Sequence, residues 1–198
     1  RPSFLKALYD KSGARATGLD FTDEGWRHDP ASFEGLELLH GTLDAAPLQP
    51  GFDVITMWHA LEHEYAPLDT LRRLRSLAAP GTALVVEVPD LDSLTFRRHG
   101  AHWAGFHTPR HTAAYTPATL RALLERAGWK VETQLRHGTL DPYVLWWLGR
   151  QELLGRSVRT SLEDRFVSFV AGKVAAFPLT LLQRWIPLGV QTAIARRA

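Results

Sequence analysis

The chain has 198 residues, 45% of them hydrophobic and 22% charged, which fits one globular domain and excludes a disordered or collagen-like protein. It has no cysteine, and this excludes disulfides, thiolate zinc sites and cysteine nucleophiles. The formal net charge is only +2 and the basic residues are spread along the chain, so we expect no nucleic-acid-binding surface.

The sequence suggests neither export nor a membrane span. Residues 1–6 lack the features of a signal peptide. No uncharged apolar run reaches the length of about 18 residues that a spanning helix needs. We therefore expect a cytoplasmic protein, with contact to a membrane surface left open.

Hydrophobic periodicity predicts alternating helices and strands in the first two thirds of the chain. This alternation indicates an α/β fold with a mostly parallel sheet and helices on both faces. In chain order we predict a helix over 3–11, strands over 14–20, 36–40 and 52–58, a helix over 67–77, a strand over 83–89, a long loop over 90–116, a helix over 117–127 and a strand over 130–135.

The stretch 142–187 differs in character, because it is rich in Trp and Phe and has apolar residues at helical spacing. We expect Pro178 and Pro187 to break it into short helices, and residues 190–196 to form a last strand. We interpret the chain as an α/β domain with a helical insertion that serves as a lid, a dimer surface or a membrane-facing segment. The boundaries are 1–141 and 188–198 for the domain and 142–187 for the insertion.

Four segments, in this order, resemble class I S-adenosylmethionine-dependent methyltransferases, especially the branch near the ubiquinone-biosynthesis O-methyltransferases. The most specific match is the strand 52–58 with the Leu-Glu-His that follows it. The resemblance covers roughly residues 1–136 and the closing strand. The segments are 13–20 (GARATGLD), 52–63 (FDVITMWHALEH), 77–84 (LAAPGTAL), and the pattern of Trp103, Pro109, His111 and Tyr115-Thr116 that leads to Leu124 and Ala127-Gly128-Trp129.

The resemblance implies a Rossmann-like fold with strand order 3-2-1-4-5-7-6, in which strand seven is antiparallel. The family's first strand and its Asp/Glu-x-Gly-x-Gly-x-Gly loop have no counterpart here, because Arg1-Pro2-Ser3-Phe4 resembles the residues just after that loop. We therefore expect strand one to be missing from this chain. Either an upstream segment of the natural protein supplies it, or this fragment alone transfers no methyl group.

The resemblance also implies a site for S-adenosylmethionine at the carboxyl ends of the strands, where α/β sheets bind ligands. The acid that ends the second family strand binds the ribose hydroxyls, and Asp20 matches it. The turn after strand three passes the adenine, and the end of strand four lies beside the cofactor. The cofactor-binding residues implied in this way are Asp20, Phe21, Thr42, Leu43, Met57 and Trp58.

Histidines supply the candidate catalytic groups, since a hydroxyl acceptor needs a base whose pKa is near the working pH. The sequence does not choose between His111 and His63. We expect the loop 90–116 to cover the substrate, which Trp103, His107 and Tyr115 would contact. The His59-x-x-Glu62-His63 arrangement also suggests a zinc site, but the methyltransferase pattern explains it, so we predict no metal.

These observations favour S-adenosylmethionine-dependent methyl transfer, most simply O-methylation, to a small or lipid-like acceptor. The aromatic residues of 142–187 motivate the lipid-like part. Two alternatives remain open: a non-catalytic pseudo-methyltransferase that acts as a binding module, and a nicotinamide-dependent Rossmann enzyme. We also consider a homodimer and peripheral contact with a membrane.

Overall fold

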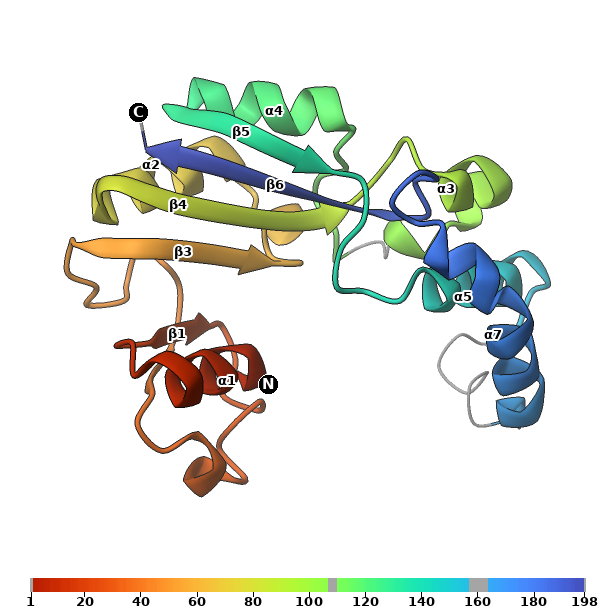
Figure 1. Cartoon of the computed structure of the whole chain (residues 1–198), viewed down its shortest axis with the longest axis horizontal. Helices are drawn as coiled ribbons and strands as arrows, with labels where there is room; N and C mark the ends of the chain where they lie inside the picture. Colours follow the sequence, from red (N-terminus) through yellow and green to blue (C-terminus); the bar gives the residue numbers. More distant parts are fainter. Residues whose placement is uncertain (1, 107–109, 157–163, 198) are drawn as a thin grey trace. The chain divides into compact units, whose positions relative to one another are not determined.

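The computed structural model describes residues 2–106, 110–156 and 164–197. These residues form two compact units, Arg1–Gln49 and Pro50–Ala198. Each unit has its own sheet, as Figure 1 shows.

The first unit is a small α/β layer. Its helix α1 (Ser3–Ser12) ends at Gly13, whose φ of 65° is in the left-handed region that favours glycine. Strands β1 (Thr17–Asp20) and β2 (Glu37–His40) pair in parallel, with Asp20 opposite His40. The 3-10 helix η1 (Pro30–Phe33) lies in the connection between them. Because the strands are parallel, their carboxyl ends meet at one edge.

The second unit contains a four-stranded sheet in the order β3-β4-β6-β5 (Figure 1). Strand β3 pairs in parallel with β4, and β6 runs antiparallel to both β4 and β5. The strands are β3 (Phe52–Trp58), β4 (Ala78–Pro89), β5 (Trp129–Leu135) and β6 (Val190–Arg197).

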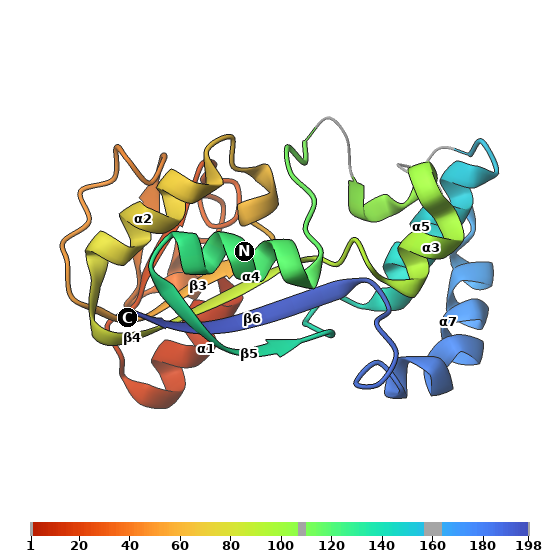
Figure 2. The ribbon, with the colours of Figure 1, turned by 90° about the horizontal axis from the view of Figure 1, so that it is seen from above.

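Helices α2 (Pro67–Leu77) and α4 (Pro117–Arg126) lie side by side over one face of this sheet (Figure 2). Their apolar residues recur every three or four positions, which places them on the sheet-facing side. Trp129 is 1% exposed and donates a hydrogen bond from Nε1 to the carbonyl of Leu71, 3.1 Å away. The buried leucines of the two helices are Leu71, Leu74, Leu77, Leu120 and Leu124.

The predicted α/β fold with a mostly parallel sheet is confirmed, including the antiparallel last strand. The two sheets separately show the neighbours that the order 3-2-1-4-5-7-6 requires: β2 beside β1, and β3-β4-β6-β5. Strand β4 begins five residues earlier than predicted, and its register with β3 shifts between Phe52 and Val54.

Two local predictions were wrong. The segment 90–116 is not one long loop, because it holds α3 (Leu94–His99) and the 3-10 helices η3 (Gly100–His102) and η4 (Ala104–Phe106). Pro178 does not break the chain, since it lies inside α7 (Phe166–Leu181).

In the described part of 142–187, two helices are present as predicted, α5 (Pro142–Leu153) and α7, and they pack against each other. Among the described residues, no helix is both long enough and apolar enough to cross a bilayer. Whether this stretch is an insertion with a function of its own stays a prediction.

Candidate functional site

Four of the predicted cofactor residues lie at the carboxyl edge of the first unit. Asp20 ends β1, and its Oδ1 accepts a hydrogen bond from the backbone N–H of Thr22 at 3.1 Å. Phe21, the next residue, has a side chain that is 78% exposed. The edge therefore offers an exposed carboxylate beside an exposed aromatic ring.

The turn after β2 joins this edge directly. The N–H of Gly41 donates to the carbonyl of Asp20 at 2.9 Å, and His40 Nε2 lies 3.0 Å from the carbonyl of Phe21. Thr42 and Leu43 follow in a short turn. The end of β1 and the turn after β2 are thus neighbours, as the predicted site requires.

The other two predicted cofactor residues end β3 in the second unit. Met57 is 9% exposed, and Trp58 is partly exposed. Trp58 lies opposite Glu87 of β4 in the parallel pair. Their position at the carboxyl end agrees with the prediction, and their contact with a cofactor stays a prediction.

His59 follows β3 and bridges two buried carboxylates. Its φ is 49°, a value that a residue with a side chain seldom adopts. The ring places Nδ1 3.3 Å from Glu62 Oε1 and Nε2 3.0 Å from Glu87 Oε1. Burial lowers the pKa of His59, but the hydrogen bonds and negative charges of Glu62 and Glu87 outweigh it and raise this pKa to about 9. His59 is therefore a cation at neutral pH.

Glu87 is the centre of this network. It is fully buried in β4, where burial alone would raise the pKa of its carboxyl group. Hydrogen bonds from His59 and Thr139 lower that pKa instead. Thr139 donates from its backbone N–H at 2.9 Å and from Oγ1 at 2.6 Å, and Thr192 donates from Oγ1 at 3.2 Å. Through these hydrogen bonds, the Glu87 carboxylate of β4 connects the residue after β3, strand β6 and the loop after β5.

The His59 contacts predict a pH dependence of stability. The folded pKa of about 9 exceeds the ordinary value of 6.5, so the contribution of His59 is fully present below 6.5 and is lost as the pH rises to 9. We expect this loss to lower the free energy of unfolding by roughly 1–3 kcal/mol. Urea unfolding of the wild type and His59→Gln between these pH values checks it. A difference between the two proteins that does not change with pH would contradict it.

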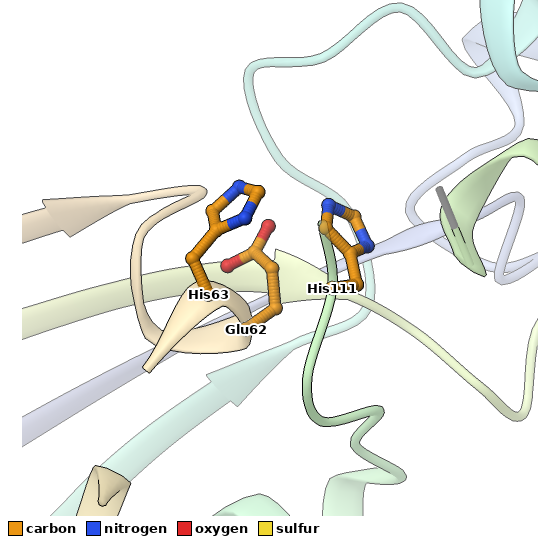
Figure 3. A group of neighbouring side chains, drawn as sticks. All are labelled: Glu62, His63 and His111. Atoms are coloured by element: carbon orange, nitrogen blue, oxygen red, sulfur yellow. The ribbon is translucent and has the colours of Figure 1, made fainter. Parts of the chain in front are cut away.

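Glu62, His63 and His111 form a second cluster, which Figure 3 shows. The 3-10 helix η2 (Leu61–His63) supplies the first two residues. The N–H of Thr112 donates to the carbonyl of Glu62 at 2.8 Å, and this contact brings His111 next to His63. The two rings meet edge to face, with centroids 4.6 Å apart.

Backbone carbonyls hold both rings. His63 Nδ1 lies 3.0 Å from the carbonyl of Arg110, and His111 Nδ1 lies 2.7 Å from that of Gly105. Each Nδ1 faces a carbonyl oxygen and therefore donates, so in the neutral form of either ring Nε2 carries the lone pair. In Figure 3 the Glu62 carboxylate points between the two rings.

Glu62 is 1% exposed, and its Oε2 has no hydrogen-bond partner in the described part of the chain. One ligand atom from each of Glu62, His63 and His111 lies within 4.8 Å of the other two. A buried carboxylate oxygen without a partner is costly, which favours a bound donor at this place. The cluster can accept a hydrogen bond from a hydroxyl group, take up its proton, or hold a divalent cation. The expected absence of a metal stays a prediction.

The predicted substrate residues differ in their surroundings. Tyr115 is 6% exposed beside the cluster and donates to the carbonyl of Leu61 at 3.4 Å, and burial raises its pKa to about 12. Trp103 is 1% exposed and donates from Nε1 to Thr95 Oγ1 at 2.9 Å, so its ring is part of the packing around α3. His107 lies outside the described residues. Contact of these residues with a substrate stays a prediction.

Sequence reasoning missed two buried ionic groups. One is the Glu87 network, and the other is Asp90, which is fully buried and bound by the Arg136 guanidinium through Nε at 3.0 Å and Nη2 at 2.8 Å. A single Glu within the apolar run 83–89 was the available signal, because a charged residue in a strand covered on both faces needs a partner.

A family model described as "Methyltransferase domain" matches residues 3–134, which are two thirds of the chain. A probable S-adenosylmethionine-dependent methyltransferase of Mycolicibacterium smegmatis is 29% identical over 125 residues, 61% of this chain and 46% of that protein. The chain thus spans about half the length of this curated relative.

Solved structures of two methyltransferases share the fold. The S-adenosylmethionine-dependent methyltransferase of Mesorhizobium loti has a TM-score of 0.63 at 15% identity, covering 98% of this chain and 85% of that one. The 1,6-didemethyltoxoflavin-N1-methyltransferase of Burkholderia thailandensis, solved with bound 1,6-didemethyltoxoflavin and S-adenosylhomocysteine, has a TM-score of 0.57 at 14% identity, covering 97% of this chain and 65% of that one. The chain belongs to the methyltransferase domain family and has its Rossmann-like fold.

Proposed function

We propose that the protein is an S-adenosylmethionine-dependent methyltransferase that acts on a hydroxyl group of a small or lipid-like molecule. The observation that carries the proposal is the buried Glu62 Oε2, which has no partner within the described residues and faces two histidines at the carboxyl end of β3. Membership of the methyltransferase domain family supports the reaction class.

The cofactor supplies an electrophilic methyl group on its sulfonium sulfur, so the protein has to bind, orient and exclude water. Asp20 fits the ribose end, because its carboxylate is exposed at a strand end and, within the described residues, accepts a hydrogen bond from the N–H of Thr22 at Oδ1. Phe21 would flank the adenosine, Thr42 or Leu43 would contact the adenine, and Met57 and Trp58 at the end of β3 are further proposed cofactor contacts.

The acceptor would bind at the cluster of Glu62, His63 and His111. Glu62 Oε2 would accept the hydrogen bond of the hydroxyl group and so orient its oxygen. His111 or His63 would take the proton at Nε2 as the methyl group is transferred. The cation at His59 is held by two carboxylates, so it is unsuited to act as the base at neutral pH.

The family resemblance also supports finer proposals. Among the described residues β3 pairs only with β4, and β1 only with β2. We propose that a strand with a glycine-rich loop takes part in the cofactor site of the natural protein. The Leu-Glu-His at 61–63 favours a relationship to the ubiquinone-biosynthesis O-methyltransferases.

Replacing Asp20 with Ala tests the cofactor part. We expect S-adenosylhomocysteine to bind roughly 10- to 100-fold more weakly, because hydrogen bonds from two ribose hydroxyls to a carboxylate are lost. Isothermal titration calorimetry on the full-length protein measures this change.

Asp44→Ala is the matched control, since Asp44 is an exposed acid in the turn after β2. Its affinity should stay within about twofold of the wild type. Equal affinities for Asp20→Ala and Asp44→Ala would contradict the assignment. Tight binding without transfer to any hydroxyl compound would favour the non-catalytic binding module.

A further inference from the structure

Helix α7 exposes an unusually apolar surface. None of its 16 residues is buried, although most are apolar. Large side chains recur along one face at spacings of one, three and four residues, and we call them the apolar stripe. It consists of Phe166 (64% exposed), Val167 (81%), Val170 (40%), Val174 (69%), Phe177 (59%) and Leu181 (60%).

A different face of α7 holds it to the rest of the unit. The ring of Phe169 lies 5.3 Å from that of Tyr143 and 5.5 Å from that of Trp147, both on α5. Lys173 Nζ forms an ion pair with Asp141 Oδ2 at 2.7 Å. The apolar stripe is thus not the surface that packs on α5, and some other partner has to cover it, because a helix that is apolar all round is normally buried.

The charged residues from Arg165 to the last residue are all basic, although Asp164 directly precedes Arg165 and Asp141 pairs with Lys173. From Arg165 to Ala198 the sequence has no Asp or Glu, whereas Arg165, Lys173 and Arg184 lie in or beside α7. Trp185, just after the helix, is 75% exposed. Arginine with exposed Trp and Phe is the composition of helices that lie in the interface of anionic membranes.

A hollow beside α7 is likewise lined by aromatic and basic side chains. Its volume is about 330 Å³, and the rings of Tyr143, Trp146 and Trp147 line it together with three guanidinium groups, those of Arg150, Arg156 and Arg165. No acidic residue lines it in the described part of the chain. Such a hollow suits the phosphate and the upper acyl chain of an anionic lipid.

We propose that α7 and the turn to Trp185 dock on an anionic lipid bilayer, with the apolar stripe in the acyl region and the arginines at the phosphates. The helix is too short to span, since 16 residues rise only about 24 Å, so it lies in the interface. A second copy is the less suitable occupant, because the hollow beside α7 is lined by three arginines and would find no excess of acidic groups on a second α7. This inference does not rest on the proposed methyl transfer.

Co-sedimentation with vesicles tests the docking without any cofactor. The full-length protein is mixed with vesicles of equal parts phosphatidylglycerol and phosphatidylcholine, or of phosphatidylcholine alone. We expect the anionic vesicles to bind on the order of tenfold more tightly or better, and this preference to shrink in high salt.

Two pairs of variants measure separately how much apolar insertion and how much positive charge contribute to vesicle binding. Val174→Glu places a carboxylate in the apolar stripe, whereas Ala175→Glu places the same charge on an exposed position of another face. We expect Val174→Glu to weaken vesicle binding at least about tenfold more than Ala175→Glu. Arg184→Gln should weaken binding to anionic vesicles several-fold, and Arg72→Gln on α2 should not.

Circular dichroism verifies that the variants are folded. The proposal is overturned if the wild type binds neither kind of vesicle, binds both equally, or loses no more affinity through Val174→Glu than through Ala175→Glu. It is also overturned if analytical ultracentrifugation shows a dimer that Val174→Glu dissociates while vesicles stay unbound, because a second copy would then cover the stripe.

Discussion

Replacing His111 with Ala is expected to slow methyl transfer roughly 100-fold or more, since the loss of a general base typically costs 10²- to 10⁴-fold. The proton of the hydroxyl acceptor would lose the nitrogen that receives it, while the groups that would bind the cofactor stay in place. The affinity for S-adenosylhomocysteine should therefore remain within about twofold. Transfer of a radiolabelled methyl group from S-adenosylmethionine to a panel of phenols and long-chain hydroxy compounds measures the effect.

His102→Ala is the matched control, because His102 belongs to the same histidine-rich segment but its ring lies 3.8 Å from Glu152, away from the cluster. His63→Ala and Glu62→Gln complete the series. A large loss for His63→Ala and none for His111→Ala would move the base to His63. Full activity in all three cluster variants would contradict a catalytic role for this cluster.

Replacing Glu87 with Ala is expected to lower the free energy of unfolding by about 3 kcal/mol, because the loss of this buried side chain leaves a cavity in β4 and removes the acceptor of the hydrogen bonds from His59, Thr139 and Thr192. His59 would keep only Glu62, and the N–H and hydroxyl of Thr139 would lose their acceptor. Urea unfolding followed by circular dichroism measures the change.

Glu132→Ala is the control for this prediction. Glu132 lies on β5 at the surface, where its carboxylate pairs with Arg196 Nε at 3.2 Å. An exposed pair of this kind contributes less than about 1 kcal/mol. Glu87→Gln should lose less than Glu87→Ala, because the amide fills the same space, its oxygen can still accept from Thr139, and His59 keeps its pair with Glu62. A Glu87→Ala protein as stable as Glu132→Ala would mean that the network does not stabilise the fold.

Local pattern was enough to predict most of the regular elements. Strand β3 and helix α2 have the predicted bounds, 52–58 and 67–77. Their signals are short range: an apolar run after Pro50-Gly51 for the strand, and leucines at helical spacing after Pro67 for the helix. The antiparallel β6 followed from the family resemblance, since the sequence of a strand does not show its direction.

The two wrong predictions concern segments whose structure depends on more than the local sequence pattern. Helix α3 was taken for loop because its six residues are held by non-local groups, such as Trp103 Nε1 and the carbonyl of Leu188, which both bond Thr95 Oγ1. Pro178 was expected to end a helix, but in an exposed helix water can satisfy the carbonyl that proline leaves without a donor.

The candidate site was predictable in part. Asp20 and the Leu-Glu-His at 61–63 were found because the resemblance points to strand ends. The link between His59 and Glu87 was not, because 28 residues separate the two and nothing local indicates their pairing. The approach of His111 to Glu62 depends on a backbone bond from Thr112, fifty residues along the chain, which composition and periodicity do not report.

A crystal structure of the full-length protein with S-adenosylhomocysteine would show which residues hold the cofactor. We expect both ribose hydroxyls to lie at hydrogen-bond distance, about 2.6–3.0 Å, from the carboxylate of Asp20. Met57 and Trp58 should also contact the cofactor. A nucleotide bound elsewhere, with Asp20 facing solvent, would contradict this placement.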